Sequence, residues 1–326
     1  MFTTPILFLV FNRPAATKKV FAQIRKIKPA FLYVAADGPR ENIQGEKEIC
    51  EEVRNLVLAN IDWDCEIKTL FRNENLGCGR AVSQAITWFF EHVEEGIILE
   101  DDCLPDCSFF FYCQALLERY RHNDNIISIS GTNFGYTFNN NQSYAYSRFM
   151  NMWGWATWRR SSLLIDYNMK NWKRIKFKKY FLFTRLNKYG SLDIKWLEYW
   201  KNYFDITSSG KLDTWDFQWI FTQLIERKIA IFPSGNLIKN IGFSENATHT
   251  TDPDHKIAGL EIKGVQFPLI PPLTIKTDEF YEEEYLKKVW CSHKNESIIY
   301  MIKTKLLYVP FIYRINEYLK KSRVKK

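Results

Sequence analysis

Three consecutive carboxylates offer the clearest chemistry in this sequence. Glu100, Asp101 and Asp102 directly follow residues 96–99, a short apolar run with the character of a buried strand. The strand must end nearby, because Pro105 cannot donate a hydrogen bond to a sheet. Carboxylates grouped at a buried strand end repel one another and are costly to desolvate. Since oxygen ligands favour hard cations, the triplet predicts a Mn²⁺ or Mg²⁺ site, with a solvated acidic turn as the alternative.

The elements that would position this triplet alternate regularly. Apolar runs and amphipathic segments predict an α/β fold with a mixed, mainly parallel sheet flanked by helices. The expected strands are 5–11, 31–36, 65–71, 97–99, 126–131 and 229–233, and the expected helices are 15–27, 46–59, 81–93, 108–122 and 215–227. Residues 237–249 are expected to form a loop. Residues 1–131 would form the first half of one domain, 132–260 the second half of the same domain, and 261–326 a basic, partly helical extension.

Polar residues follow each of the first strands. Ligands of parallel sheets bind beyond the carboxyl ends of the strands, so these residues are expected to meet there. Arginines could offset phosphate charge, and an aspartate could accept hydrogen bonds from a base or ribose. Each alone could equally be a solvated loop residue. The set comprises Asn12, Arg13, Asp37, Asn75, Gly77 and Arg80.

This order of motifs resembles the GT-A-fold glycosyltransferases, which use nucleotide sugars. The similarity rests on Asn12-Arg13-Pro14 after the first strand, Asp37-Gly38 after the second, Asn75-x-Gly77 before a helix, and then Glu100-Asp101-Asp102. It is closest to the N-acetylglucosaminyltransferase I-like branch and its bacterial relatives, and it covers residues 4–250. It implies a metal-dependent, inverting transferase of the hexosyltransferase class. It also implies that residues 1–131 are the nucleotide-sugar-binding half and 132–260 the acceptor and catalytic half.

The resemblance also implies roles on the donor side. Asp102 would bind Mn²⁺ (or Mg²⁺) directly, supported by Glu100 and Asp101, while Arg13 and Asp37 would lie at the nucleotide. It favours a UDP-sugar donor, of which UDP-GlcNAc is one candidate. In place of the histidine that the branch uses for uracil, this sequence has Gly79-Arg80, and Arg80 could take the phosphate side.

Further roles fall in the second half of the chain. The branch has a catalytic aspartate beside a tryptophan, which matches Asp216 after Trp215, with Asp213 as the second candidate. Asp216 could instead simply favour the dipole at a helix start. The stretch Trp153-Gly154-Trp155 resembles a sugar-pocket segment, although three aromatics could also form core. His249 would be a further metal ligand or a structural histidine.

Charge and composition bear on partners and location. The chain has 326 residues and a net charge of +8, concentrated in residues 170–179 and in the tail 303–326. The first hundred residues are not notably basic, so nucleic acid is not an expected partner. The basic tail predicts contact with an anionic membrane. The seven cysteines form no CxxC pair and residues 5–11 are too short to span a bilayer, so we expect a cytoplasmic protein, peripheral at the inner face of the plasma membrane.

The expected function is sugar transfer from a nucleotide diphosphate to a glycan or lipid-linked acceptor in surface polysaccharide synthesis. A sugar-phosphate nucleotidyltransferase is an alternative, although residues 11–14 lack the glycine-rich loop that such enzymes use to approach a triphosphate. A carbohydrate-binding protein that has lost the chemistry is a second alternative, against which the intact carboxylates argue.

Overall fold

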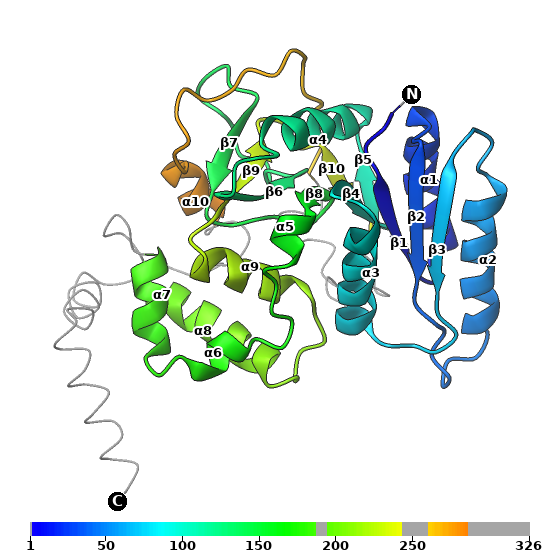
Figure 1. Ribbon diagram of the computed structural model, residues 1–326, viewed down its shortest axis with the longest axis horizontal. Coiled ribbons are helices and arrows are strands. Elements are labelled where there is room, and N and C mark those ends of the chain that lie inside the picture. Colours follow the sequence, from blue (N-terminus) through cyan, green and yellow to red (C-terminus); the bar gives the residue numbers. More distant parts are fainter. Residues whose placement is uncertain (1, 187–193, 243–259, 286–326) are drawn as a thin grey trace, which may run out of the picture.

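The computed structural model describes residues 2–186, 194–242 and 260–285. They form an eight-stranded mixed sheet with helices on both faces and a small two-stranded sheet beside it, which confirms the predicted fold class (Figure 1). Four of the seven strand pairings in the large sheet are parallel. Across these ranges no helix combines the length and apolar character needed to cross a membrane.

The large sheet has a parallel half and a mixed half. Its strands lie in the order β3 (Glu66–Phe71), β2 (Phe31–Ala36), β1 (Ile6–Val10), β4 (Glu95–Glu100), β8 (Trp155–Trp158), β6 (Ile126–Ser130), β9 (Ile229–Pro233) and β7 (Tyr144–Ser147). Strand β8 runs antiparallel to both of its neighbours, β4 and β6. The small sheet pairs β5 (Cys103–Pro105) with β10 (Ile238–Asn240), also antiparallel.

Each face of the sheet buries its own core because side chains alternate along a strand. On β1, Ile6, Phe8 and Val10 pack with α1, α2 and α4, whereas Leu7 and Leu9 pack on the opposite face with α3. The helices of the first half are α1 (Pro14–Ile27), α2 (Glu46–Ala59), α3 (Cys78–His92) and α4 (Cys107–Arg119). Those of the second half are α5 (Arg159–Ser162), α6 (Lys170–Arg174), α7 (Lys178–Leu186), α8 (Ile194–Ser208) and α9 (Asp216–Ile225).

The predicted elements agree with the observed ones where local patterns are strong. Strands β2 and β9 and helix α2 match residue for residue. The prediction of a loop over 237–249 is wrong at β10, and β5, β7 and β8 were not predicted. These strands have only three or four residues, so their own sequence carries little periodicity. Their conformation is decided by the partner strand.

The segment after residue 260 closes the outer edge of the sheet. Ser143 N–H donates to the Ile270 carbonyl at 2.8 Å, and Thr277 forms a parallel bridge with Tyr146 on the edge strand β7. Beyond the bridge lies α10 (Glu279–Tyr285), whose Tyr281 is fully buried and stacks on Phe232 with ring centroids 3.6 Å apart. Covering an edge strand in this way removes a template for aggregation. The predicted boundary at 260 therefore does not separate the residues up to 285 from the core.

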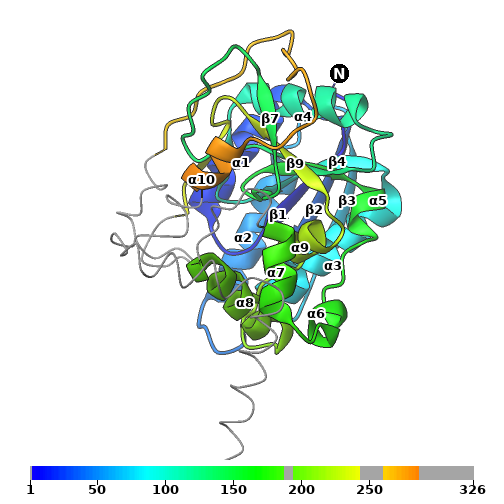
Figure 2. The ribbon, with the colours of Figure 1, turned by 90° about the vertical axis from the view of Figure 1, so that its left-hand side faces the viewer.

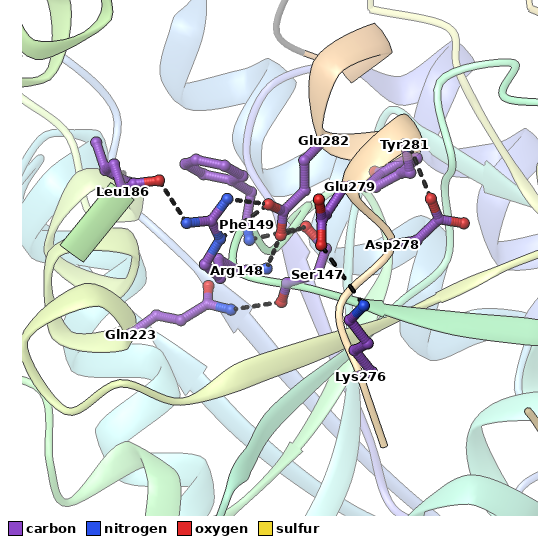
Figure 3. Close-up of polar contacts among 10 residues, drawn as sticks. All are labelled: Ser147, Arg148, Phe149, Leu186, Gln223, Lys276, Asp278, Glu279, Tyr281 and Glu282. Carbon is purple, nitrogen blue, oxygen red and sulfur yellow. Dashed lines mark hydrogen bonds and ion pairs between the residues drawn. The ribbon is translucent and has the colours of Figure 1, made fainter. Parts of the chain in front are cut away.

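An ion pair fastens this helix to the rest of the domain (Figure 3). The Glu282 carboxylate, 2% exposed, accepts from Arg148 Nε at 2.8 Å and from the Arg148 backbone N–H at 2.6 Å. Arg148 Nη1 donates in turn to the carbonyl of Leu186, the last residue of α7, at 2.5 Å. Arg148 thus ties α10 to the helical layer formed by α7 and α8.

The loops that follow β2 and β3 share one end of the molecule with α6, α7 and α8. Figure 1 shows them at the lower end of the sheet, and the view turned by 90° in Figure 2 keeps both groups there. The helical layer of the second half therefore lies at the end of the sheet where parallel α/β folds bind ligands.

Candidate functional site

Asp101 is the buried member of the acidic triplet, and Glu100 and Asp102 are half-buried. Glu100 ends β4, and Asp101 and Asp102 form the turn into β5. Asp101 is 6% exposed, and its burial, together with the neighbouring Asp102, raises its pKa to about 7. Burial also raises the pKa of Glu100 well above its usual range, with Asp102, Asp101 and Asp216 adding to the shift. The alternative of a simple solvated turn is therefore wrong.

Arg13 is the counter-charge that the fold supplies. Its Nη1 donates to Asp102 Oδ2 at 2.8 Å and lies 3.6 Å from Asp101 Oδ1. The Phe11 backbone N–H also donates to Asp101 Oδ2 at 3.3 Å. One guanidinium serves a cluster of three carboxylates, so the pKa values of Glu100 and Asp101 stay raised despite its charge.

The donor set fits a hard divalent cation that shares its coordination with substrate. In the described ranges no three His, Cys, Asp or Glu side chains converge into a ready metal site. Mg²⁺ sites in phosphate-handling enzymes commonly use one or two carboxylates and complete their shell with phosphate oxygens and water. Asp102 could supply such a ligand once its contact with Arg13 opens. His249, the other predicted ligand, lies outside the described residues.

Asp37 organises the loop after β3. Its carboxylate accepts from Asn75 Nδ2 at 3.0 Å, from the Leu76 N–H at 3.0 Å and from the Gly77 N–H at 3.1 Å. Burial raises the pKa of Asp37, although these hydrogen bonds and the nearby charge of Arg72 oppose the shift. The structure thus joins three residues that the sequence predicts for nucleotide binding. It also shows that Asp37 fixes the conformation of the loop at residues 75–77 through these hydrogen bonds.

Asn12 belongs to a second polar group, which the sequence analysis missed. Asn12 Nδ2 donates to Glu46 Oε1 at 2.8 Å, and Arg40 Nε donates to both oxygens of that carboxylate. Arg40 also lines an open depression of about 400 Å³ beside the loops after β2 and β3, whose walls are Pro39, Arg40, Glu41, Asn42, Glu74 and Asn75. The only sequence signal for this group was that Arg40 directly follows the turn residues Gly38-Pro39.

The two candidate bases occupy different environments. Asp213 Oδ1 accepts from the Gly79 N–H at 2.9 Å, so this carboxylate caps the start of α3. Asp216 begins α9, and its charge adds to the raised pKa of Glu100. Burial raises the pKa of Cys78, and the charges of Glu100, Asp213 and Asp216 raise it further.

The tryptophan motif is divided between core and surface. Trp155 is 1% exposed and stacks on Trp215 with ring centroids 5.9 Å apart, so the prediction that Trp155 contacts a sugar is wrong. A ring enclosed on all sides presents no face to a ligand. Trp153 is half-buried against Phe134. Gly154 adopts φ +59°, and a Cβ there would lie 2.4 Å from Ile238, so glycine allows β10 to pack closely.

Strand β10 and the two residues after it complete the surroundings of Asp102. The Ile241 N–H donates to the Asp102 carbonyl at 2.8 Å, and a Cβ on Gly242 would lie 2.2 Å from Asp102 Oδ2. No local pattern in residues 237–242 signals this contact, because it depends on pairing with β5. Arg80 lies in the first turn of α3, directly after Gly79, and its side chain is exposed.

Comparisons with known proteins give distant similarities only. Neither a protein-family model nor a curated protein sequence matches this chain. A solved mannosyltransferase, PcManGT from Pyrobaculum calidifontis in complex with GDP-Man and Mn²⁺, is 13% identical over 48% of this chain and 45% of its own, with a TM-score of 0.33. This chain therefore spans less than half of that protein.

Two further solved structures cover more of this chain. Mouse xyloside xylosyltransferase 1 is 9% identical over 69% of this chain and 82% of its own, with a TM-score of 0.32. A UDP-glucose pyrophosphorylase complexed with UDP-glucose is 10% identical over 70% and 90%, with a TM-score of 0.33. At these scores the similarities assign no activity, and the function has to be argued from the site itself.

Proposed function

We propose that this protein is a metal-dependent, inverting glycosyltransferase that moves a sugar from a nucleotide diphosphate to a glycan or lipid-linked acceptor. The observation that carries the proposal is the triplet Glu100-Asp101-Asp102, in which Asp101 is buried and one arginine, Arg13, pairs with Asp101 and Asp102. Carboxylates held this close repel one another, and a divalent cation with its phosphate ligand would relieve that repulsion. The resemblance noted in the sequence favours a UDP-sugar.

The donor would lie across the strand ends. Asp102 would hold Mn²⁺ or Mg²⁺, with Glu100 and Asp101 in support, and the metal would stabilise the charge of the departing diphosphate. Arg13, released from Asp102, could then pair with a phosphate. Arg80 stands exposed at the start of α3 as a second cation. The base and ribose would occupy the depression beside Asn75, close to the loop that Asp37 organises.

Asp216 would act as the general base. Its carboxylate would take the proton of an acceptor hydroxyl while that oxygen bonds to the anomeric carbon of the sugar. The bond from that carbon to the diphosphate breaks in the same step, and the diphosphate leaves with the electron pair. Trp153, the partly exposed member of the tryptophan motif, would flank the sugar. Trp155 would act only indirectly, by supporting Trp215.

A donor panel read by release of nucleoside diphosphate tests the proposal. Wild-type protein with Mn²⁺ should release diphosphate from at least one nucleotide sugar, and Asp102→Asn should abolish the metal-dependent release. Asp124→Asn is a matched control, because the Asp124 side chain is exposed and its carboxylate pairs with Arg160 at the surface, away from the triplet. Full turnover by Asp102→Asn, or pyrophosphate production from a nucleoside triphosphate and a sugar phosphate, would refute the assignment.

Membrane attachment through the basic tail is a separate part of the proposal. Residues 303–326 lie outside the described residues, so the argument rests on their charge alone. A chain ending at residue 302 should bind vesicles containing phosphatidylserine more weakly than the full chain. Equal binding by the two chains would exclude the tail as the anchor.

A further inference from the structure

Two glycines at the start of α3 touch the turn that leads into α9. A Cβ on Gly77 would lie 2.5 Å from Asp213 Oδ2, and a Cβ on Gly79 would lie 2.7 Å from Asp213 Oδ1 and 2.8 Å from the Thr214 carbonyl oxygen. Gly77 also has a φ of +80°, which favours glycine. The Gly79 N–H uses this closeness to donate to Asp213 Oδ1 at 2.9 Å. The donor-side loop and the turn before α9 are therefore in direct contact.

The same turn orients Asp216. The Thr214 hydroxyl donates to Asp216 Oδ1, and the Phe217 N–H donates to the same oxygen at 2.8 Å. Gln218 Nε2 donates back to the Thr214 carbonyl at 2.9 Å. Thr214 is thus bonded through its side chain and its backbone to the first turn of α9, and a shift of Thr214 would move the Asp216 carboxylate.

Both ends of this contact are anchored. On the donor side, Asp37 accepts from the Leu76 and Gly77 N–H groups, so the chain entering α3 is held to the end of β2. On the acceptor side, Trp215 stacks on the buried Trp155 of β8. Asp213 is the side chain whose hydrogen bond joins these two anchored parts.

We propose that Asp213 is a positioning residue, a latch that holds the donor loop at residues 75–79 against the turn that orients Asp216. This inference rests on the proposed function, since it assigns Asp216 as the base and a nucleotide diphosphate as the ligand of the loop. Asp213 itself contacts no substrate. Without the latch, the 213–216 turn loses its bond to α3, and a displaced base loses rate even though donor binding persists. A displacement of about 1 Å can cost ~100-fold.

The test compares two substitutions of Asp213 that differ in whether they keep an oxygen at the Oδ1 position. Asp213→Ala removes the acceptor for the Gly79 N–H, whereas Asp213→Asn keeps an amide oxygen that can accept it. Transfer kinetics with Mn²⁺ should show kcat about 100-fold lower in Asp213→Ala, with the donor KM within about threefold of wild type. Asp213→Asn should recover kcat to within about fivefold and keep the acidic limb of the pH profile, because Asp216 remains the base. Asp124→Asn serves as the unchanged control.

Each of the other possible results would overturn either the latch or the proposed function. Equal loss of kcat in Asp213→Asn and Asp213→Ala, with loss of the acidic limb, would make Asp213 the base and overturn the latch. If the wild type is active and Asp213→Ala has the same kcat, the latch alone is overturned. A wild type without turnover on every donor would overturn the proposed function, and with it the catalytic purpose of the latch.

Discussion

The ion pair between Arg148 and Glu282 allows a quantitative test of how α10 is held. We expect Glu282→Gln to lower the free energy of unfolding by about 3 kcal/mol. The substitution removes the negative charge from a side chain that is 2% exposed and leaves the Arg148 guanidinium, 17% exposed, without a counter-ion. Breaking a buried pair from one side typically costs about 3–5 kcal/mol, and the glutamine amide keeps part of the hydrogen bonding, which places the estimate at the lower end.

Urea unfolding followed by tryptophan fluorescence measures this loss. The midpoint should fall while the slope stays unchanged, because the surface exposed on unfolding is the same. Glu279→Gln is the matched control on the same helix. Glu279 pairs with Lys276 at 3.7 Å near the surface (Figure 3), and such pairs contribute about 0–1 kcal/mol. A loss in Glu282→Gln no larger than in Glu279→Gln would refute the claim that the pair fastens α10 to the domain.

Three further predictions concern the site. Asp102→Asn should abolish the rise in melting temperature that Mn²⁺ with a nucleoside diphosphate produces in wild type; an unchanged rise would remove Asp102 from the metal site. Arg13→Met should tighten Mn²⁺ binding to the free protein about tenfold by calorimetry, because it removes the guanidinium that lies 2.8 Å from Asp102 Oδ2. Weaker binding would contradict the claim that Arg13 and the metal compete for Asp102. Hydrogen bonds from Arg40 lower the pKa of Glu46, so this carboxylate stabilises the fold above its unfolded pKa of about 4.3 and loses that effect as pH falls through its lower folded value. Glu46→Gln should therefore cost about 1–3 kcal/mol at pH 7 and progressively less as the pH falls below about 4.3, and a pH-independent loss in urea unfolding would contradict the charge argument.

The sequence predicted those parts of the fold whose signals are local. Helix α2 and strands β2 and β9 were located to the residue, because amphipathic periodicity and buried apolar runs need no distant partner. The alternation of these elements was enough to predict an α/β sheet. It also placed Asp37, Asn75 and Gly77 at one end of that sheet, where the structure joins them by hydrogen bonds.

Other features depended on residues far apart in the chain. The sequence ranked Asp216 above Asp213 through the resemblance alone, because the hydrogen bond that Asp213 accepts joins it to Gly79, 134 positions away. Trp155 was expected at a sugar, but the packing of β8 between β4 and β6 buries it. The strands β5 and β10 have too few residues to show a pattern, so only their pairing revealed that Gly242 lies against Asp102.

For the acidic triplet, the sequence determined which residues form it, and the structure determined what surrounds them. The sequence alone set three carboxylates at the end of an apolar strand, because residue order and the effect of proline on a sheet are local properties. Whether those groups lie in water or out of it depends on what the fold packs around them. Only the tertiary structure buried Asp101, brought Arg13 to Asp102 and added the charge of Asp216 to the surroundings of Glu100, since desolvation and charge pairing arise between segments distant in the chain.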